Sequence, residues 1–212
     1  MNRDGGYDEG YRACSCFWGR EPSSLVRELE KVLTSFEECS VLDVGCGEGK
    51  NAAYMAVRGA RVLALDVSPL AVQNARRAWP DTPGIEWVCS DALVGDFGAE
   101  VFDVILAYGI FHCLQDQHEI QELHWRLSEA TKVGGYHVVC TFNSRQQDLS
   151  AHPGFRPCLC EHSFYVDLYG NWELLVATDS DLAEVHPHNG ILHTHSMTRL
   201  LARKAGNHDL NG

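Results

Sequence analysis

Short apolar runs rich in β-branched residues alternate with amphipathic stretches from Val41 onward, which is typical of βαβ units and a parallel sheet. The predicted strands are 41–44, 61–65, 86–89, 102–107 and 136–142. The predicted helices are 22–33, 51–58, 69–78 and 115–131, the last ending before two glycines. Ser68 and Pro69 supply a cap and a first residue for the helix 69–78.

The last third of the chain has a different pattern. Beyond Phe142 it is richer in Pro, His and Cys up to about His162, which predicts an irregular segment or a short helix over the strand ends. Segments 172–178 and 193–201 predict a closing antiparallel pair. The expected fold class is therefore α/β, a doubly wound, Rossmann-like, seven-stranded and mostly parallel sheet with an antiparallel C-terminal edge.

Length and charge narrow the class of protein. The 212 residues, 45% of them hydrophobic, suit one domain with a substantial core. A net charge of −12 would repel a phosphate backbone, so we expect no nucleic-acid partner. The first ten residues are polar and acidic, and no apolar run approaches the roughly 20 residues that span a membrane. We expect a cytoplasmic protein without a membrane partner, as a monomer or a homodimer.

The nine cysteines are odd in number and scattered, which suits reduced thiols better than a disulfide framework. Two C-x-C pairs, 14–16 and 158–160, raise the question of a metal. Structural zinc sites typically use C-x(2–4)-C spacing instead, so we assign no metal ligand from the sequence.

A glycine-rich turn, Gly45-Cys46-Gly47-Glu48-Gly49, directly follows the first predicted strand. Glycines at this place let the backbone approach a ligand at the carboxyl ends of the strands. Lys50 stands where the dinucleotide fingerprint requires glycine, which weakens a nicotinamide interpretation. Asp66, at the end of the second strand, is placed to accept hydrogen bonds from ribose hydroxyls. Asp91, at the end of the third strand, is placed to accept a hydrogen bond from the adenine amine, beside the backbone of Ala92.

Taken in order, four segments resemble class I S-adenosylmethionine-dependent methyltransferases: Val41 to Gly49, Ala64-Leu65-Asp66, Cys89-Ser90-Asp91-Ala92 and Phe102-Asp103-Val104-Ile105. The resemblance implies S-adenosylmethionine as the cofactor, with Asp43 and the loop on its methionine part. The expected cofactor-binding residues are Trp18, Asp43, Gly45, Cys46, Gly47, Gly49, Asn51, Asp66, Val67, Asp91, Ala92 and Ala107.

The flanks are similar to the family of the tellurite-resistance methyltransferase. The similarity rests on Phe17-Trp18-Gly19-Arg20-Glu21-Pro22-Ser23, Tyr169-Gly170-Asn171-Trp172-Glu173, Glu184-Val185-His186 and Leu200-Leu201-Ala202-Arg203-Lys204. It implies that His186 helps to activate an oxyanion or chalcogen nucleophile near arginines. This chain departs there, because the loop to Met197 carries Pro187, His188, His193 and His195 and no arginine. The departure argues against a small inorganic oxyanion, which usually needs Arg or Lys.

Methyl transfer needs an acceptor placed in line with the methyl group, and a base helps when the acceptor carries a proton. The expected catalytic residues are His186, His112 and Tyr108, with Tyr108 facing the methyl group and with a capping or core role as the alternative for His112. The histidines around His186 could also bind a metal together with Cys158 and Cys160. Alternatively, they are solvated histidines on an edge strand, with His193 and His195 on one face.

The sequence predicts a methyltransferase that acts on an oxygen, nitrogen or sulfur atom of a small-molecule acceptor, in specialised metabolism. Two alternatives stay open: a chalcogen oxyanion or thiol detoxifying methyltransferase, and a non-catalytic adenosylmethionine-binding protein. We expect a single methyltransferase domain over 1–205, with an N-terminal lid and helix (1–40), a cofactor-binding core (41–142) and an acceptor-side segment with closing strands (143–205). Residues 206–212 are expected to form a disordered tail.

Overall fold

The computed structural model describes residues 6–186 and 189–206, so Pro187, His188 and most of the expected tail lie outside the described residues. Seven strands form one sheet in the order β3-β2-β1-β4-β5-β7-β6. Strands β1 to β5 run parallel, and β7 is antiparallel to both of its neighbours. Their bounds are β1 (Ser40–Val44), β2 (Arg61–Asp66), β3 (Ile85–Cys89), β4 (Phe102–Tyr108), β5 (Thr131–Gln147), β6 (Trp172–Val185) and β7 (Leu192–Lys204). The predicted fold class is confirmed.

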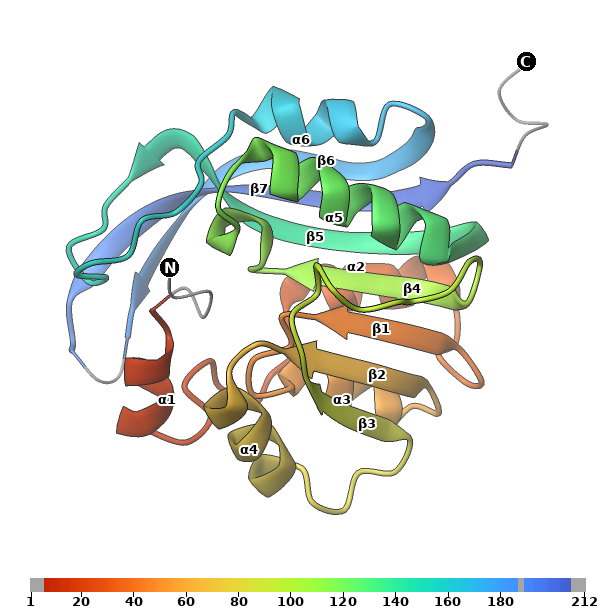
Figure 1. Cartoon of the computed structure of the whole chain (residues 1–212), viewed down its shortest axis with the longest axis horizontal. Coiled ribbons are helices and arrows are strands. Elements are labelled where there is room, and N and C mark those ends of the chain that lie inside the picture. Colours follow the sequence, from red (N-terminus) through yellow and green to blue (C-terminus); the bar gives the residue numbers. More distant parts are fainter. Residues whose placement is uncertain (1–5, 187–188, 207–212) are drawn as a thin grey trace.

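Helices cover both faces of the sheet (Figure 1). One face carries α5 and α6, and α2 and α3 lie behind the other; α1 lies beside α4 at the carboxyl ends of the parallel strands. Their bounds are α1 (Asp8–Ala13), α2 (Ser24–Leu33), α3 (Lys50–Ala56), α4 (Pro69–Ala78), α5 (Gln117–Ala130) and α6 (His162–Leu168), with a 3-10 turn η1 (Phe111–Cys113) after β4.

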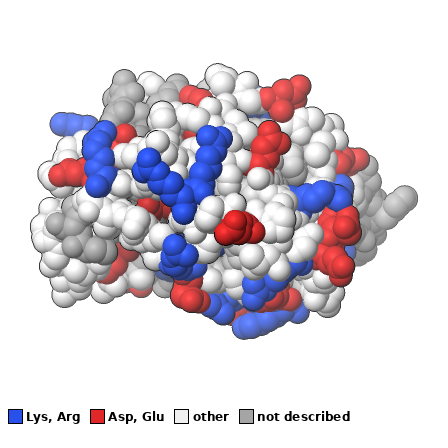
Figure 2. Space-filling view, turned by 90° about the horizontal axis from the view of Figure 1, so that it is seen from below, with Lys and Arg blue, Asp and Glu red and all other residues white. Residues whose placement is uncertain are grey.

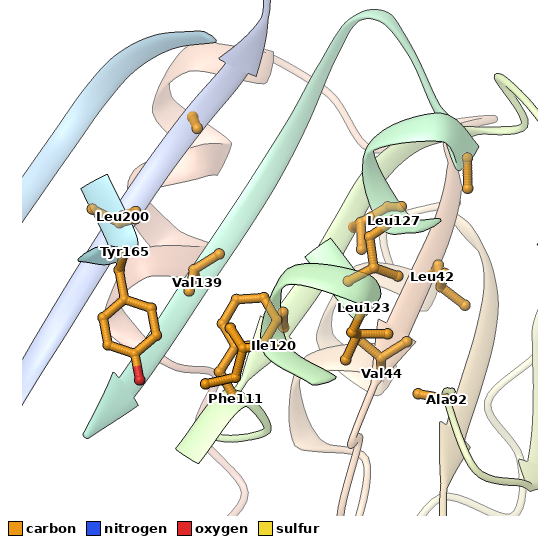
Figure 3. Close-up of a cluster of buried hydrophobic side chains, with 14 of the residues drawn as sticks. Leu42, Val44, Ala92, Phe111, Ile120, Leu123, Leu127, Val139, Tyr165 and Leu200 are labelled. Atoms are coloured by element: carbon orange, nitrogen blue, oxygen red, sulfur yellow. The ribbon is translucent and has the colours of Figure 1, made fainter. Parts of the chain in front are cut away.

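The core forms where the apolar stripe of a helix meets one face of the sheet. Leu123 of α5 is fully buried and points toward Val44 of β1, while Ile120, also fully buried, lies beside Phe111 (Figure 3). Leu42 of β1 belongs to the same cluster. Val41, which precedes Leu42 in sequence, faces the opposite layer with α2 and α3. This alternation follows from the two-residue period of a strand. Burial of apolar side chains on both faces stabilises the sheet, in which parallel pairing places the carboxyl ends of β1, β2 and β4 side by side.

The predicted strands and helices of the core are found within a few residues, and α4 coincides with the predicted helix 69–78. Three differences stand out. Helices α1 and α6 each span one to two turns, too few residues to give a clear periodic signal. Strand β5 starts at Thr131 and includes the glycine pair that was expected to separate helix from strand. Strand β6 starts where predicted but extends beyond its predicted end, and strand β7 extends beyond its predicted limits at both ends.

The interpretation of His193 and His195 as solvated edge-strand residues is wrong. Strand β7 lies between β5 and β6, so β6 is the edge strand. The two side chains are 2% and 0% exposed. They do share one face of β7, because alternate residues of a strand point the same way.

Ser68 caps α4 and also ties it to α1. Its Oγ accepts a hydrogen bond from the Ala71 backbone N–H at 3.1 Å and donates one to Asp8 Oδ1 at 2.5 Å.

We expect Ser68→Ala to lower the free energy of unfolding by about 1 kcal/mol, because the α4 N-terminus loses its cap. The melting temperature should fall by about 2–4 °C. Glu161 is the control, because it precedes α6 without a side-chain cap hydrogen bond. In thermal denaturation, Glu161→Ala should lower the free energy of unfolding by no more than about 0.5 kcal/mol. Equal losses of stability in the two variants would contradict the capping role of Ser68.

Surface charge is mixed rather than uniformly acidic. Figure 2 shows the side of β3 and α4, where Lys and Arg side chains gather with Asp and Glu among them. Arg76 and Arg77, in the last turn of α4, place positive charge at the helix C-terminus, where it stabilises the helix dipole. Within the described ranges, no helix has the length and apolar character needed to cross a bilayer.

Candidate functional site

The glycine loop between β1 and α3 is held in a conformation that favours glycine. Gly45, Gly47 and Gly49 have φ values of +68°, +55° and +78°. A Cβ on Gly47 would lie 3.1 Å from the Tyr11 hydroxyl. The Gly47 N–H donates to Asp66 Oδ2 at 2.8 Å, so the end of β2 fixes the middle of the loop. The loop therefore presents bare backbone to the space in front of the strand ends.

Asp43, in β1, has a buried carboxyl group. It is 2% exposed, and its Oδ2 has no hydrogen-bond partner among the described residues. Burial, followed by the nearby carboxylate of Asp66, raises the pKa of Asp43 to about 8. A cationic group beside Oδ2 would supply the missing partner and favour the ionised form.

The N-terminal segment closes over the glycine loop. The Trp18 indole N–H donates to the Tyr11 hydroxyl at 3.2 Å, and Lys50 Nζ donates to the Trp18 carbonyl oxygen at 2.9 Å. Glu48 Oε1 accepts from the Cys16 N–H at 3.1 Å and from the Asn74 amide at 3.0 Å. Glu48 and Lys50, which follow β1, therefore hold the N-terminal segment over the glycine loop through direct hydrogen bonds.

A cavity of about 1030 Å³ lies between the lid and the strand ends. Most of the sequence-predicted site residues line it: Trp18, Asp43, Gly45, Cys46, Gly47, Gly49, Asn51, Tyr108, Asp66, Val67, Asp91, Ala92 and His112. Ala107 and His186 do not line it. Ala107 is packed in the core, and His186 packs against Phe17, with ring centroids 5.1 Å apart.

The far side of the cavity is built on one continuous face of β5, β7 and β6. Paired residues of these strands, Cys140 with Arg199 and Phe142 with Met197, both line it. Glu184 of β6 extends the same wall. The segment from His186 to Met197 has no arginine, but Arg199, two residues further on the same face of β7, reaches the cavity. The segment is free of arginine as predicted, and Arg199 brings a positive charge to the cavity from outside it.

His112 is buried and its ring is fixed at both nitrogens. The Phe142 backbone N–H donates to Nδ1 at 3.2 Å, so Nδ1 is the acceptor and Nε2 carries the proton, which faces the Tyr7 hydroxyl at 3.3 Å. Burial, and then the charges of His195 and His152, lower the pKa of His112 to about 3. This geometry argues against His112 as a base, because its lone pair is already used.

Comparison with known proteins agrees with this geometry. A family model described as a methyltransferase domain matches residues 41–135. A demethylmenaquinone methyltransferase of Thermobifida fusca is 35% identical over 106 residues, 49% of this chain and 43% of that protein. The chain spans about half the length, or less, of the curated relatives it matches.

Residues 41–135 therefore form a methyltransferase domain, and the chain has the fold of the class I S-adenosylmethionine-dependent methyltransferases. Solved structures share the fold. TehB from Haemophilus influenzae superposes with a TM-score of 0.72 at 20% identity, covering 95% of this chain and 67% of its own. The 1,6-didemethyltoxoflavin-N1-methyltransferase of Burkholderia thailandensis, solved with 1,6-didemethyltoxoflavin and S-adenosylhomocysteine, gives a TM-score of 0.68 at 20% identity over 96% of this chain and 87% of its own.

The residues of this methyltransferase fit S-adenosylmethionine. The cofactor offers an ammonium group, and Asp43 Oδ2 is a buried acceptor for which the described part of the chain supplies no partner. The positive φ values of the glycine loop leave the backbone without the side chains that would block a close approach. Asp66 and Asp91 stand at the ends of β2 and β3 and line the same cavity.

Several residues of this methyltransferase site were not predicted from the sequence. Tyr7 precedes α1 and Tyr11 lies within it, and this helix was not predicted. Lys50 was considered only as a departure from a nucleotide motif. Arg199 had a usable signal: the two-residue period that places His193 and His195 on one face continues through Met197 to Arg199.

Proposed function

We propose that the protein transfers the methyl group of S-adenosylmethionine to an oxygen, nitrogen or sulfur atom of a small-molecule acceptor, in specialised metabolism. The observation that carries this is the cavity of about 1030 Å³, which runs from the glycine loop to Arg199 and Glu184. Ligand pockets are typically about 300–1,000 Å³, so this one has room for a cofactor and a second small molecule.

In this proposal the side of the glycine loop holds the cofactor. Asp66 accepts from the ribose hydroxyls, Asp91 and the backbone of Ala92 hold the adenine, and Asp43 takes the ammonium group. The cofactor supplies an electrophilic methyl group on a sulfonium. The chain's own contribution is to hold donor and acceptor in line and to exclude water beneath Trp18, which lowers the barrier by orientation.

The acceptor side is both polar and enclosed. The Tyr108 hydroxyl stays protonated, because burial raises its pKa far above neutrality, so it donates rather than acts as a base. Cys140 and Met197 contribute apolar surface beside it. Of the three catalytic residues expected from the sequence, Tyr108 has the best support. His186 lies off the cavity, and the His112 lone pair is already occupied.

The chalcogen oxyanion alternative is supported by one specific observation, which is that Arg199, Arg156 and Lys50 all line the cavity. Arginine and lysine provide the charge that a small oxyanion needs. Turnover of selenite or tellurite would support this alternative, whereas turnover of organic acceptors alone would exclude it.

The proposed function is tested by calorimetry with S-adenosylhomocysteine and by transfer of a labelled methyl group to a panel of organic acceptors. Binding together with transfer to an organic acceptor is the expected result. Binding without transfer to any acceptor would favour the non-catalytic cofactor-binding protein. Binding of NAD in place of S-adenosylhomocysteine would overturn the proposal.

For Asp66→Ala we expect at least about a tenfold loss of S-adenosylhomocysteine affinity, since hydrogen bonds to a charged group contribute about 1.5–3 kcal/mol. The variant loses the proposed ribose contacts and also the Gly47 anchor. Asp96→Ala is the control, because Asp96 is exposed and its Oδ1 accepts from the Gly98 N–H. Unchanged affinity in Asp66→Ala, measured by calorimetry, would remove Asp66 from the site.

A further inference from the structure

Four imidazoles and one carboxylate converge beyond the far end of the cavity. His152 Nε2 lies 3.1 Å from His193 Nε2, 3.1 Å from His186 Nε2 and 3.2 Å from His195 Nε2. Glu184 Oε1 lies 3.5 Å from His193 Nε2 and 3.6 Å from His195 Nε2. The cluster joins three segments: the end of β6, the start of β7 and the loop after β5.

Hydrogen bonds alone do not account for this arrangement. One Nε2 atom carries either one proton or one lone pair, yet His152 Nε2 faces three other ring nitrogens. The partners of the outer nitrogens show where each neighbouring ring carries its proton.

The outer nitrogens of His193 and His195 face oxygen acceptors. His193 Nδ1 lies 2.9 Å from the Ile191 carbonyl oxygen, so it must donate. His195 Nδ1 lies 2.7 Å from Gln147 Oε1, and the Gln147 amide nitrogen donates to the carbonyl oxygens of Asn143 and Ser196, which fixes that amide's orientation. Each ring therefore carries a proton on Nδ1, which leaves Nε2 to face the centre of the cluster.

As a result, lone pairs face lone pairs at the centre of the cluster. Nε2 of His193 and Nε2 of His195 are acceptors, and Glu184 Oε1 lies 3.5 and 3.6 Å from them, too far for an ordinary hydrogen bond. A cation at the centre would turn this repulsion into coordination. Histidine ligands of metals usually donate their outer N–H to a carbonyl or carboxylate in this way.

The spacing suits a transition metal. With metal–nitrogen distances of about 2.0–2.1 Å, neighbouring ligand nitrogens lie roughly 3.0–3.4 Å apart. The observed separations of 3.1 and 3.2 Å fall in that range. The ligand atoms of His152, Glu184, His193 and His195 all lie within 4.8 Å of one another.

We propose that His152, Glu184, His193 and His195 bind one divalent transition-metal ion, of the kind that prefers imidazole over oxygen ligands, such as Zn²⁺, Co²⁺ or Ni²⁺. His186 stands beside this set, 3.8 Å from Glu184 Oε1 through its Nε2. Cys158 and Cys160, considered from the sequence as partners of these histidines, are not part of it. The metal site is distinct from the methyl-donor site. Glu184 connects the two, because it is a proposed ligand and also lines the acceptor side of the cavity.

The test is calorimetric titration of the full chain with Zn²⁺, together with absorption spectroscopy of the Co²⁺ form. We expect one ion per chain with a Kd of about 1 μM or below. His152→Gln and His193→Gln should each weaken binding at least tenfold, and His118→Gln, an exposed histidine of α5, should leave it unchanged. Binding of S-adenosylhomocysteine by each variant shows that it folds, because none of these three side chains lines the cavity.

Two results would overturn the proposal. One is the absence of one-to-one Zn²⁺ binding, or a Zn²⁺ affinity that is equal in the wild type, His152→Gln and His193→Gln. The other is a strong thiolate-to-cobalt charge-transfer band that disappears in Cys158→Ser, because it would place the metal on the C-x-C pair. A Co²⁺ spectrum with ligand-field bands and no thiolate band supports the histidine cluster.

Discussion

Replacing Gly47 by alanine is expected to lower the affinity for S-adenosylhomocysteine at least about 30-fold, which corresponds to about 2 kcal/mol. The new Cβ would lie 3.1 Å from the Tyr11 hydroxyl and 3.6 Å from Trp18 Cδ1, in the space between the loop and the lid. The backbone at φ +55° also becomes strained, because an L-residue in this region costs roughly 1–2 kcal/mol. Isothermal calorimetry measures the first effect, and thermal denaturation measures the second.

Gly134→Ala separates strain from binding. Gly134 also has a positive φ, +78°, but it lies outside the cavity, and the nearest atom to its new Cβ would be Arg203 Nη2 at 3.8 Å. We expect it to lose stability to a similar extent and to keep full cofactor affinity. If both variants bind equally well, the glycine loop does not approach the cofactor as proposed.

The parts of the fold that could be predicted are those specified over a few neighbouring residues. The α4 helix was found to the residue because Ser68, Pro69 and the apolar stripe act locally. The glycine loop was found because positive φ values at alternate positions require glycine, whatever surrounds them. Asp66 was placed at the cavity because parallel strands end at the same edge of a sheet.

The histidine cluster could not be predicted in the same way. His152 comes from a segment without a period, and its contacts with His193 and His186 span 41 and 34 positions of the sequence. The interpretation of solvated histidines depended on β7 being an edge strand, and the order of β6 and β7 is a property of the sheet rather than of either strand. Likewise, the role of α1 in the lid depends on contacts such as that between Asp8 and Ser68.

Asp43→Asn is expected to separate stability from cofactor binding. In the folded protein without cofactor, the pKa of Asp43 is about 8 rather than 3.8, so the folded state binds more protons than the unfolded state between these values. The wild type therefore loses stability as pH rises through this window, and the asparagine variant does not. We expect the variant's free energy of unfolding, relative to wild type, to rise by about 2–4 kcal/mol from about pH 5 to about pH 8.

The same substitution should weaken binding of S-adenosylhomocysteine at least about 30-fold near pH 8, because a neutral amide replaces the carboxylate that faces the ammonium group. In the wild type the ligand favours ionised Asp43, so affinity should rise with pH up to about 8, and this rise should vanish in the variant. Denaturation and calorimetry across the pH range measure both effects, with the exposed Asp96→Asn as the control. A variant that is more stable and still binds tightly would show that the buried charge of Asp43 serves neither the cofactor nor the fold.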